Sequence, residues 1–255
     1  MQYIGIDIGS TSAKTAVLDD NKNLIYHFVQ PTGWSSIETA EAIRVNLVQH
    51  GYDPEGSVTV ATGYGRVSVP YANKLITEIT CHAVGASFLH ELAEVTVIDI
   101  GGQDTKIIRV ENKMVADFIM NDKCSAGTGR FLEVMANTLG VRQGELDELA
   151  AKGSNTSISS MCTVFAESEV ISLIGRGERK ENIAFAIVDS IVKKVSSQAV
   201  RLVKSGSPVC LTGGLCESNY IRTALAEALK VTVIAKPEGR YAGAIGAALS
   251  ARKGW

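Results

Sequence analysis

The sequence predicts an α/β fold made of two lobes on one plan, with a ligand cleft between them. A strand, a turn of small residues and a second strand lie near the start, and the design recurs with Asp99 in the place of Asp7, 92 residues later. A third apolar strand ends in a glycine pair and leads into a helical pattern. The chain has 255 residues, 45% hydrophobic and 20% charged, so it is long enough for two globular lobes.

The first copy of the repeat spans residues 3–18. Small residues in its turn let the backbone approach a ligand, successive N–H groups form an anion-binding concavity, and hydroxyl groups add donors. These properties suit phosphate. A lysine at the start of the second strand would neutralise phosphate charge, although a strand lysine is also typical of a solvent-exposed face. The predicted phosphate ligands are Gly9, Ser10, Thr11, Ser12, Ala13 and Lys14.

The second copy spans residues 95–113 and adds Gly101, Gly102, Gln103 and Asp104 as phosphate ligands. Asp7 and Asp99 end the first strand of their copies, and we expect both to be buried and to organise Mg²⁺, directly or through water. Gln103 and Asp104 would orient the attacking water, because phosphoryl transfer depends mainly on positioning. These four are the predicted catalytic residues. A plain hairpin with a glycine-rich turn is the alternative for either copy alone, and two matching copies favour the ligand site.

Later segments are predicted from their local patterns. Gly213 and Gly214 follow an apolar strand, and a helix is expected after Ser218. Residues 241–249 read as a helix of small residues that packs closely against another helix. The stretch from Ser35 to Glu38 is a capping box that opens a helix ending near residue 51, and residues 183–195 carry the apolar stripe of a long helix.

These four glycine-containing stretches, in this order, resemble the phosphate-1, phosphate-2, adenosine and connect-2 motifs of the actin, Hsp70 and sugar-kinase superfamily. The resemblance implies two ribonuclease-H-like lobes with ATP and Mg²⁺ in the cleft. Lobe I would comprise residues 1–93 plus 237–255, and lobe II residues 94–236. It also implies that Gly213 and Gly214 lie against the nucleoside.

Three further residues are candidates for contact with the nucleotide. The same resemblance suggests that Glu145 reaches the ribose, and Asn219 and Arg240 flank the nucleoside motif. The alternative for Glu145 is a negative charge favoured by a helix N-terminus.

Five cysteines, at positions 81, 124, 162, 210 and 216, are an odd number that suits a reduced, cytoplasmic compartment better than a disulfide framework. Cys124 and Cys162 are each predicted to open a helix, where the macrodipole favours the thiolate. A 4Fe-4S cluster needs four thiolates, so a twofold homodimer would complete the ligand set. The alternative, a small buried hydrophobic side chain, is kept for the other three cysteines.

The cysteine segments at residues 121–131 and 159–167, together with Thr62–Arg66 and Gly101–Asp104, resemble the activators of 2-hydroxyacyl-CoA dehydratases and related BadF/BadG/BcrA/BcrD-type ATPases. The resemblance implies a homodimer with one shared cluster, which ferredoxin or flavodoxin reduces. It also implies that ATP hydrolysis drives low-potential electrons from the cluster to a dehydratase or another iron-sulfur reductase, including partners of the double-cubane-cluster type. The loop that contains Gly127 would touch both ATP and cluster.

Charge and hydropathy exclude two classes of partner. The formal net charge is −2 and both signs are mixed along the chain, so no footprint for nucleic acid exists. No apolar run approaches the roughly 18 residues that span a bilayer. Two rival functions remain: a small-molecule kinase of the same superfamily without a cluster, and a nucleotide sensor without turnover.

Overall fold

A computed structural model of the protein describes residues 1–160, 162–204 and 206–252. The chain forms two compact units. Unit 1 contains Met1–Val97, Ile108–Phe118 and the segment from Lys236 onward, and unit 2 contains Ile98–Ile107 and Ile119–Ala235. The lobe boundaries expected from the sequence stay a prediction.

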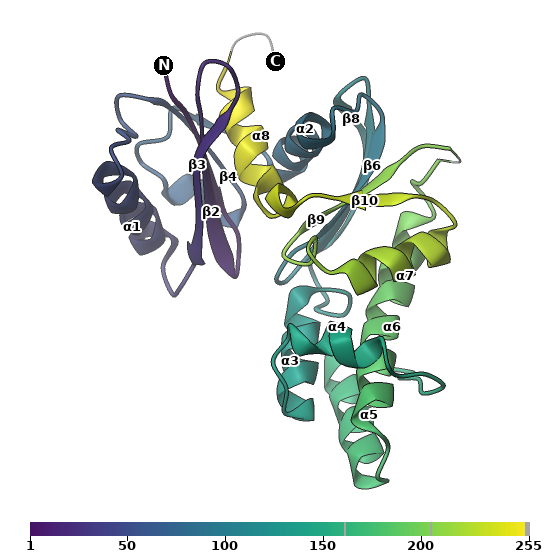
Figure 1. The fold of residues 1–255 in the computed structure, drawn as a ribbon. Helices are drawn as coiled ribbons and strands as arrows, with labels where there is room; N and C mark the ends of the chain where they lie inside the picture. The colour runs from purple at the N-terminus through teal and green to yellow at the C-terminus, as the bar shows by residue number, and fades with distance from the viewer. Residues whose placement is uncertain (161, 205, 253–255) are drawn as a thin grey trace. The chain divides into compact units, whose positions relative to one another are not determined.

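Unit 1 is organised around a five-stranded sheet in the order β3-β2-β1-β4-β5. Helix α1 covers one face of this sheet, and α2 and α8 cover the other (Figure 1). Strand β1 runs antiparallel to β2 and parallel to β4. The elements are β1 (Tyr3–Ile8), β2 (Ser12–Leu18), β3 (Leu24–Pro31), α1 (Ser36–Gln49), β4 (Val58–Thr62), the 3-10 helix η1 (Tyr64–Ser68), β5 (Lys74–Leu75), α2 (Glu78–His90), the 3-10 helix η2 (Pro237–Tyr241) and α8 (Ala242–Ser250).

Alternation along β1 places its side chains on the two faces of the sheet. Ile4, Ile6 and Ile8 are fully buried in the core that α1 completes. Gly5 points the other way, where a Cβ atom would overlap the backbone oxygen of Ala244 in α8. Asp7 shares the parity of Gly5, so its carboxylate lies on the sheet face that α2 and α8 cover.

Helices α2 and α8 cross at backbone contact. A Cβ atom on Gly85 would overlap the carbonyl of Ala242, and one on Gly246 would overlap the carbonyl of Cys81. The small residues of α8 are therefore required by its approach to α2, which confirms the close packing predicted for residues 241–249.

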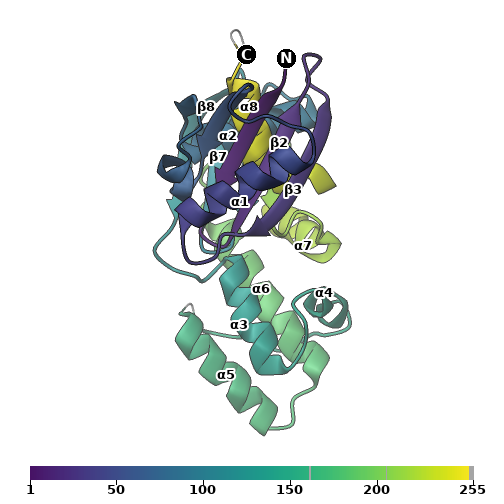
Figure 2. The ribbon, with the colours of Figure 1, turned by 90° about the vertical axis from the view of Figure 1, so that its left-hand side faces the viewer.

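Unit 2 is organised around the sheet β10-β9-β6-β7-β8, of which residues 95–97 and 108–118 count with unit 1. Helices α3, α5 and α6 pack against one another (Figure 2). The core of this unit joins the sheet to the apolar stripe of α6 that the sequence predicts. The elements are β6 (Val95–Ile100), β7 (Thr105–Glu111), β8 (Met114–Asn121), α3 (Gly129–Leu139), α4 (Glu145–Ala150), α5 (Thr163–Gly175), α6 (Lys180–Ala199), β9 (Val209–Gly213), α7 (Asn219–Leu229) and β10 (Val233–Ala235).

The predicted helix starts are confirmed at three places and wrong at one. The Ser35 hydroxyl accepts from the N–H of Glu38, and the Ser218 hydroxyl caps α7 in the same way. Cys162 is the N-cap of α5. Cys124, however, opens no helix: it lies in a loop four residues before Thr128, the N-cap of α3.

Within the described ranges, every helix is too short or too polar to span a bilayer.

Candidate functional site

The phosphate-1 turn of unit 1 connects β1 to β2. The N–H of Gly9 donates to the carbonyl of Ser12 (3.2 Å), and Thr32 fixes the turn from outside, donating from its hydroxyl to Gly9 (2.7 Å) and from its N–H to Thr11 (3.1 Å). Ser10 and Thr11 are exposed, so both hydroxyls are open to a ligand.

The first residues of β2 differ in what they offer to a ligand. Ala13 is fully buried in the core beside α1, so only its backbone could contact a phosphate. Ser12 and Lys14 are half-buried, and a Cβ atom on Gly9 would lie 4.0 Å from the Lys14 Nζ. The lysine amine is therefore beside the turn, as the sequence predicts.

Asp7 is buried in unit 1 with 5% of its surface exposed. Its carboxylate occupies space that two glycines leave free, since a Cβ atom on Gly63 or on Gly243 would overlap a carboxylate oxygen. The Nε2 atom of His82 lies 3.7 Å from Asp7 Oδ2. No pattern in the sequence around His82 points to this contact.

The phosphate-2 turn of unit 2 (Gly101–Asp104) joins β6 to β7 and lies beside a buried cluster of charged side chains. Asp99 and Lys106 are 2% and 3% exposed, and Asp104 is 8% exposed. Lys106 Nζ lies 2.7 Å from Asp104 Oδ2 and 3.5 Å from Asp99 Oδ2. The other oxygen of Asp99 accepts from the Thr212 hydroxyl (2.8 Å). The Lys106 ammonium group thus joins both carboxylates in one buried cluster.

Glycines let neighbouring backbone segments lie against this cluster. A Cβ atom on Gly101 would overlap the Asp104 carboxylate, and one on Gly213 (φ 84°) would overlap the carbonyl of Ile100. The N–H of Gly214 donates to that same carbonyl (3.1 Å). The structure thus brings the phosphate-2 turn and the predicted nucleoside glycines together at the end of β6.

The open residues of the turn face solvent. Gln103 is exposed, and Gly101 and Gly102 are half-buried. A Cβ atom on Gly214 would meet no atom within 4 Å, so one side of this glycine is open.

The loop that carries Cys124 is hydrogen bonded to the phosphate-2 turn. The Thr105 hydroxyl donates to the carbonyl of Gly127 (2.6 Å), whose φ of 89° favours glycine. The N–H of Gly129 donates to Gly101 (2.9 Å), and the N–H of Arg130 donates to Gly102 (2.8 Å). The first turn of α3 therefore rests on the backbone of the turn.

The two candidate cluster ligands lie on neighbouring segments. Cys124 and Cys162 are both exposed. The residues directly after them, Ser125 and Thr163, are joined by a hydroxyl hydrogen bond of 2.7 Å. In residues 1–160, 162–204 and 206–252, no three His, Cys, Asp or Glu side chains form a group able to hold a metal ion.

The other three cysteines are buried. Loss of solvent raises the pKa of the Cys81 thiol to about 12. Burial, with a smaller contribution from Asp99, raises the pKa of the Cys210 thiol even further. Both side chains therefore stay protonated at neutral pH, and Cys216 packs in the core of unit 2.

The remaining nucleotide-contact candidates are Glu145, Asn219 and Arg240. Glu145 begins α4 and accepts from the N–H (2.7 Å) and guanidinium (3.2 Å) of Arg142, the arrangement expected for a charge at a helix N-terminus. Asn219 begins α7 and accepts from Arg222 (3.2 Å). Arg240 belongs to η2 in unit 1.

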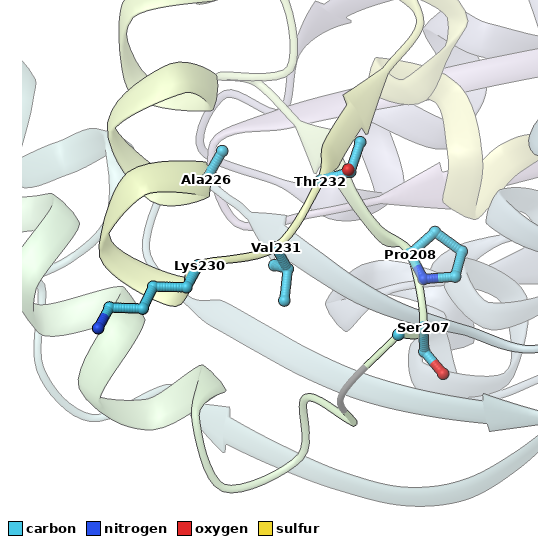
Figure 3. A pocket seen from close by; sticks show the side chains of 7 residues that line it. Ser207, Pro208, Ala226, Lys230, Val231 and Thr232 are labelled. Carbon is cyan, nitrogen blue, oxygen red and sulfur yellow. The ribbon is translucent and has the colours of Figure 1, made fainter.

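One pocket of unit 2 lies at the wrong end of the strands for a nucleotide site. Its lining includes Ser207, Pro208 and Val231, which precede the parallel strands β9 and β10 (Figure 3). Gly213 ends β9 at the opposite edge of the sheet. The pocket is therefore separate from the glycine pair. Ligands of open α/β sheets bind outside the carboxyl ends of the strands, so the end with the glycine pair is the one expected to bind a nucleotide.

Comparison with known proteins gives a consistent result. The chain is 45% identical to the (R)-2-hydroxyglutaryl-CoA dehydratase activating ATPase of Acidaminococcus fermentans, over 98% of this chain and 96% of that protein. It is 38% identical, with a TM-score of 0.89, to the activator of the 2-hydroxyisocaproyl-CoA dehydratase from Clostridium difficile with bound ADPNP, over 98% and 94% of the two chains.

A more distant neighbour shares the fold alone. This is a ROK family glucokinase from Streptomyces griseus in complex with glucose and AMPPNP, 15% identical over the full length of both chains, with a TM-score of 0.67. The two five-stranded sheets and this likeness confirm the fold class predicted from the sequence. Residues 4–251 match the model of the BadF/BadG/BcrA/BcrD ATPase family, to which this chain therefore belongs.

Proposed function

We propose that this protein is an ATP-hydrolysing activator that holds a 4Fe-4S cluster and drives single electrons into a partner iron-sulfur enzyme. The observation that carries the proposal is the hydrogen-bonded path from the phosphate-2 turn to the cysteines. Gly101 and Gly102 accept from the first turn of α3, and Ser125 in the preceding loop is bonded to Thr163. A rearrangement of the turn would therefore reach both cysteine segments within one unit.

The cysteines fit half of a cluster site. The thiols of Cys124 and Cys162 are exposed on segments that a hydrogen bond joins, and four thiolates are needed for a 4Fe-4S group. When bound, such a cluster supplies one-electron chemistry at low potential. Two chains related by a twofold axis would provide four thiolates.

Helix α5 offers a surface for a second copy of the chain. Val164, Phe165, Ile171 and Ile174 are between 44% and 67% exposed, although all are large apolar residues. Two of them come directly after Cys162 and Thr163. An exposed apolar face beside a half-complete ligand set supports a homodimer that meets at the cysteines.

The phosphate turns would bind ATP and Mg²⁺. Ser10 and Thr11 offer hydroxyl groups, and Lys14 offers a positive charge beside them. Asp7 and Asp99 would hold Mg²⁺, directly or through water, and Gln103 with Asp104 would orient the attacking water.

Glycines and three polar side chains complete the proposed nucleotide site. The backbone of Gly213 and Gly214 would lie against the nucleoside. Further proposed contacts come from Gly9, Ser12, Ala13, Gly101, Gly102, Gly127, Glu145, Asn219 and Arg240.

The electron would come from ferredoxin or flavodoxin and pass to a 2-hydroxyacyl-CoA dehydratase or a related iron-sulfur reductase. The two most similar relatives described above are named for activation of such dehydratases. We infer that the ATP and ADP states differ in how they hold the Cys124 loop. Hydrolysis can drive electron transfer only if the two states differ in their affinity for the partner or in the potential of the cluster. Replacing Gly127 with a bulky residue should then uncouple ATP turnover from electron transfer.

The decisive experiment measures iron in anaerobically purified protein. We expect about four irons and four sulfides per dimer, and a loss of most iron in Cys124→Ser and in Cys162→Ser. Cys216→Ala, a change at a buried cysteine, is the matched control and should keep its iron. If both serine variants retain wild-type iron, the proposal is wrong; a colourless wild-type protein that phosphorylates a sugar would instead favour a kinase.

A further inference from the structure

The segment that leads into Cys162 is held by a carboxylate from the helix that Cys162 begins. Glu169 lies seven residues after the cysteine on α5. One of its oxygens accepts from the N–H of Ser159 (2.8 Å), and the other accepts from the Ser159 hydroxyl (2.9 Å) and the N–H of Ser160 (2.9 Å). Three donors from two consecutive residues thus converge on one side chain.

These bonds restrict the backbone on the incoming side of the cysteine. Cys162 is an N-cap in extended conformation (φ −90°, ψ 130°), so the chain turns from the approaching segment into α5 at this residue. Glu169 fixes Ser159 and Ser160, and the hydroxyl bond between Thr163 and Ser125 fixes the first residue of the helix. Described residues on both sides of Cys162 are therefore restrained.

The Cys124 loop has a corresponding restraint. The side-chain amide of Asn121 donates to the carbonyls of Cys124 (2.8 Å) and Ala126 (3.2 Å). Both cysteines thus sit on backbone that neighbouring polar side chains hold, while their thiols remain exposed.

The charge of Glu169 matters to this arrangement. Hydrogen bonds from Ser160 and Ser159 lower the pKa of its carboxyl group, so the side chain is ionised at neutral pH. Bonds to an ionised acceptor are stronger than those between neutral groups. The anchor therefore holds the exposed Ser159 and the half-buried Ser160 in place.

We propose that Glu169 is a positioning residue for Cys162: it presets the thiol for the metal site before any metal is bound. The inference rests on the proposed cluster function. Removing a residue that orients a metal ligand through a hydrogen bond lowers metal affinity or activity by about 10- to 100-fold. We expect an effect at the lower end of that range, because Glu169 acts through the backbone of its two serine partners.

The test compares Glu169→Ala and Glu169→Gln with wild type in the full-length protein. Glu167→Gln is the matched control: it removes the same charge from the same helix, but Glu167 accepts from Thr138 (3.0 Å) on α3. The first readout is amide hydrogen exchange of peptides covering residues 156–162, with and without prior chelation of iron. The second is the anaerobic rate of iron release to a chelator.

In Glu169→Ala we expect the amides of Ser159 and Ser160 to exchange faster with or without iron, and iron to be released about tenfold faster. Glu169→Gln, which keeps one acceptor, should be intermediate, and Glu167→Gln should match wild type. Unchanged exchange would refute the anchor. Faster exchange with wild-type iron release would refute the positioning role. A Cys162→Ser variant that keeps its iron would instead refute the cluster function, so the two failures are distinguishable.

Discussion

Replacing Lys106 with methionine tests the buried charge cluster of unit 2. The change keeps most of the side-chain volume and removes the positive charge that Asp99 and Asp104 share. At an effective dielectric constant of about 20, Coulomb's law gives roughly 6 kcal/mol for the 2.7 Å contact and roughly 5 kcal/mol for the 3.5 Å contact. Desolvation of the ammonium group opposes these gains by several kcal/mol.

The net loss should be about 3–5 kcal/mol of the free energy of unfolding, the range observed when one member of a buried ion pair is removed. Urea unfolding followed by far-ultraviolet circular dichroism measures it. The control is Lys193→Met, because Lys193 lies at the same 2.7 Å from Asp189 but with its side chain 69% exposed. That variant should lose less than about 1 kcal/mol.

A second variant separates charge from packing. Adding Asp104→Asn to Lys106→Met removes one of the two carboxylates that Lys106 contacts, and should restore part of the stability. If Lys106→Met is no less stable than Lys193→Met, burial does not strengthen this cluster and the reasoning is refuted. If the double variant is less stable than Lys106→Met, charge imbalance is not the cause of the loss.

Two further outcomes are expected from burial and close packing. In metal-free native protein at pH 8, iodoacetamide should modify the exposed thiols of Cys124 and Cys162 but not that of Cys210, whose raised pKa and burial protect it until denaturation. Peptide mass spectrometry would show the labelling pattern, and rapid labelling of Cys210 would contradict the expectation. Gly246→Ala should lower the free energy of unfolding by at least about 1–3 kcal/mol, because the added methyl group meets the backbone of α2. Gly175→Ala, where a Cβ atom meets nothing within 4 Å, should not lower the melting temperature; equal melting temperatures for the two variants would contradict the close crossing of α2 and α8.

Patterns set by local chemistry could be predicted from the sequence. Asp7 and Asp99 were expected to be buried at strand ends because each follows an apolar run and precedes a glycine turn, and both are buried. The caps at Ser35 and Ser218 follow from hydroxyl groups placed just before helical patterns.

The sequence places the start of α3 too early, because the backbone conformation of Gly127 decides where this helix begins. Gly127 adopts a φ of 89°, which no helix interior allows, and its carbonyl accepts from Thr105 of a distant strand. The loop with Cys124 therefore stays outside the helix. A single sequence shows the glycine but does not show the strand hydroxyl that selects its conformation.

The partners of Lys106 and His82 also could not be found from local patterns. A lysine in a strand is usually exposed, and only its place in the repeat, seven residues after Asp99 as Lys14 is after Asp7, hinted otherwise. The structure then separates the two copies: Lys106 is buried and Lys14 is half-buried. Their difference depends on tertiary contacts that the repeat does not encode.

The presence of two exposed thiols on a single chain has a kinetic consequence for maturation of the proposed dimer. Neither subunit alone can saturate a four-thiolate centre, so the step that completes it requires an encounter between subunits. If that encounter limits the process, its initial velocity is second order in protein, and halving the concentration slows it about fourfold. Dilute preparations would mature slowly even when iron and sulfide are abundant.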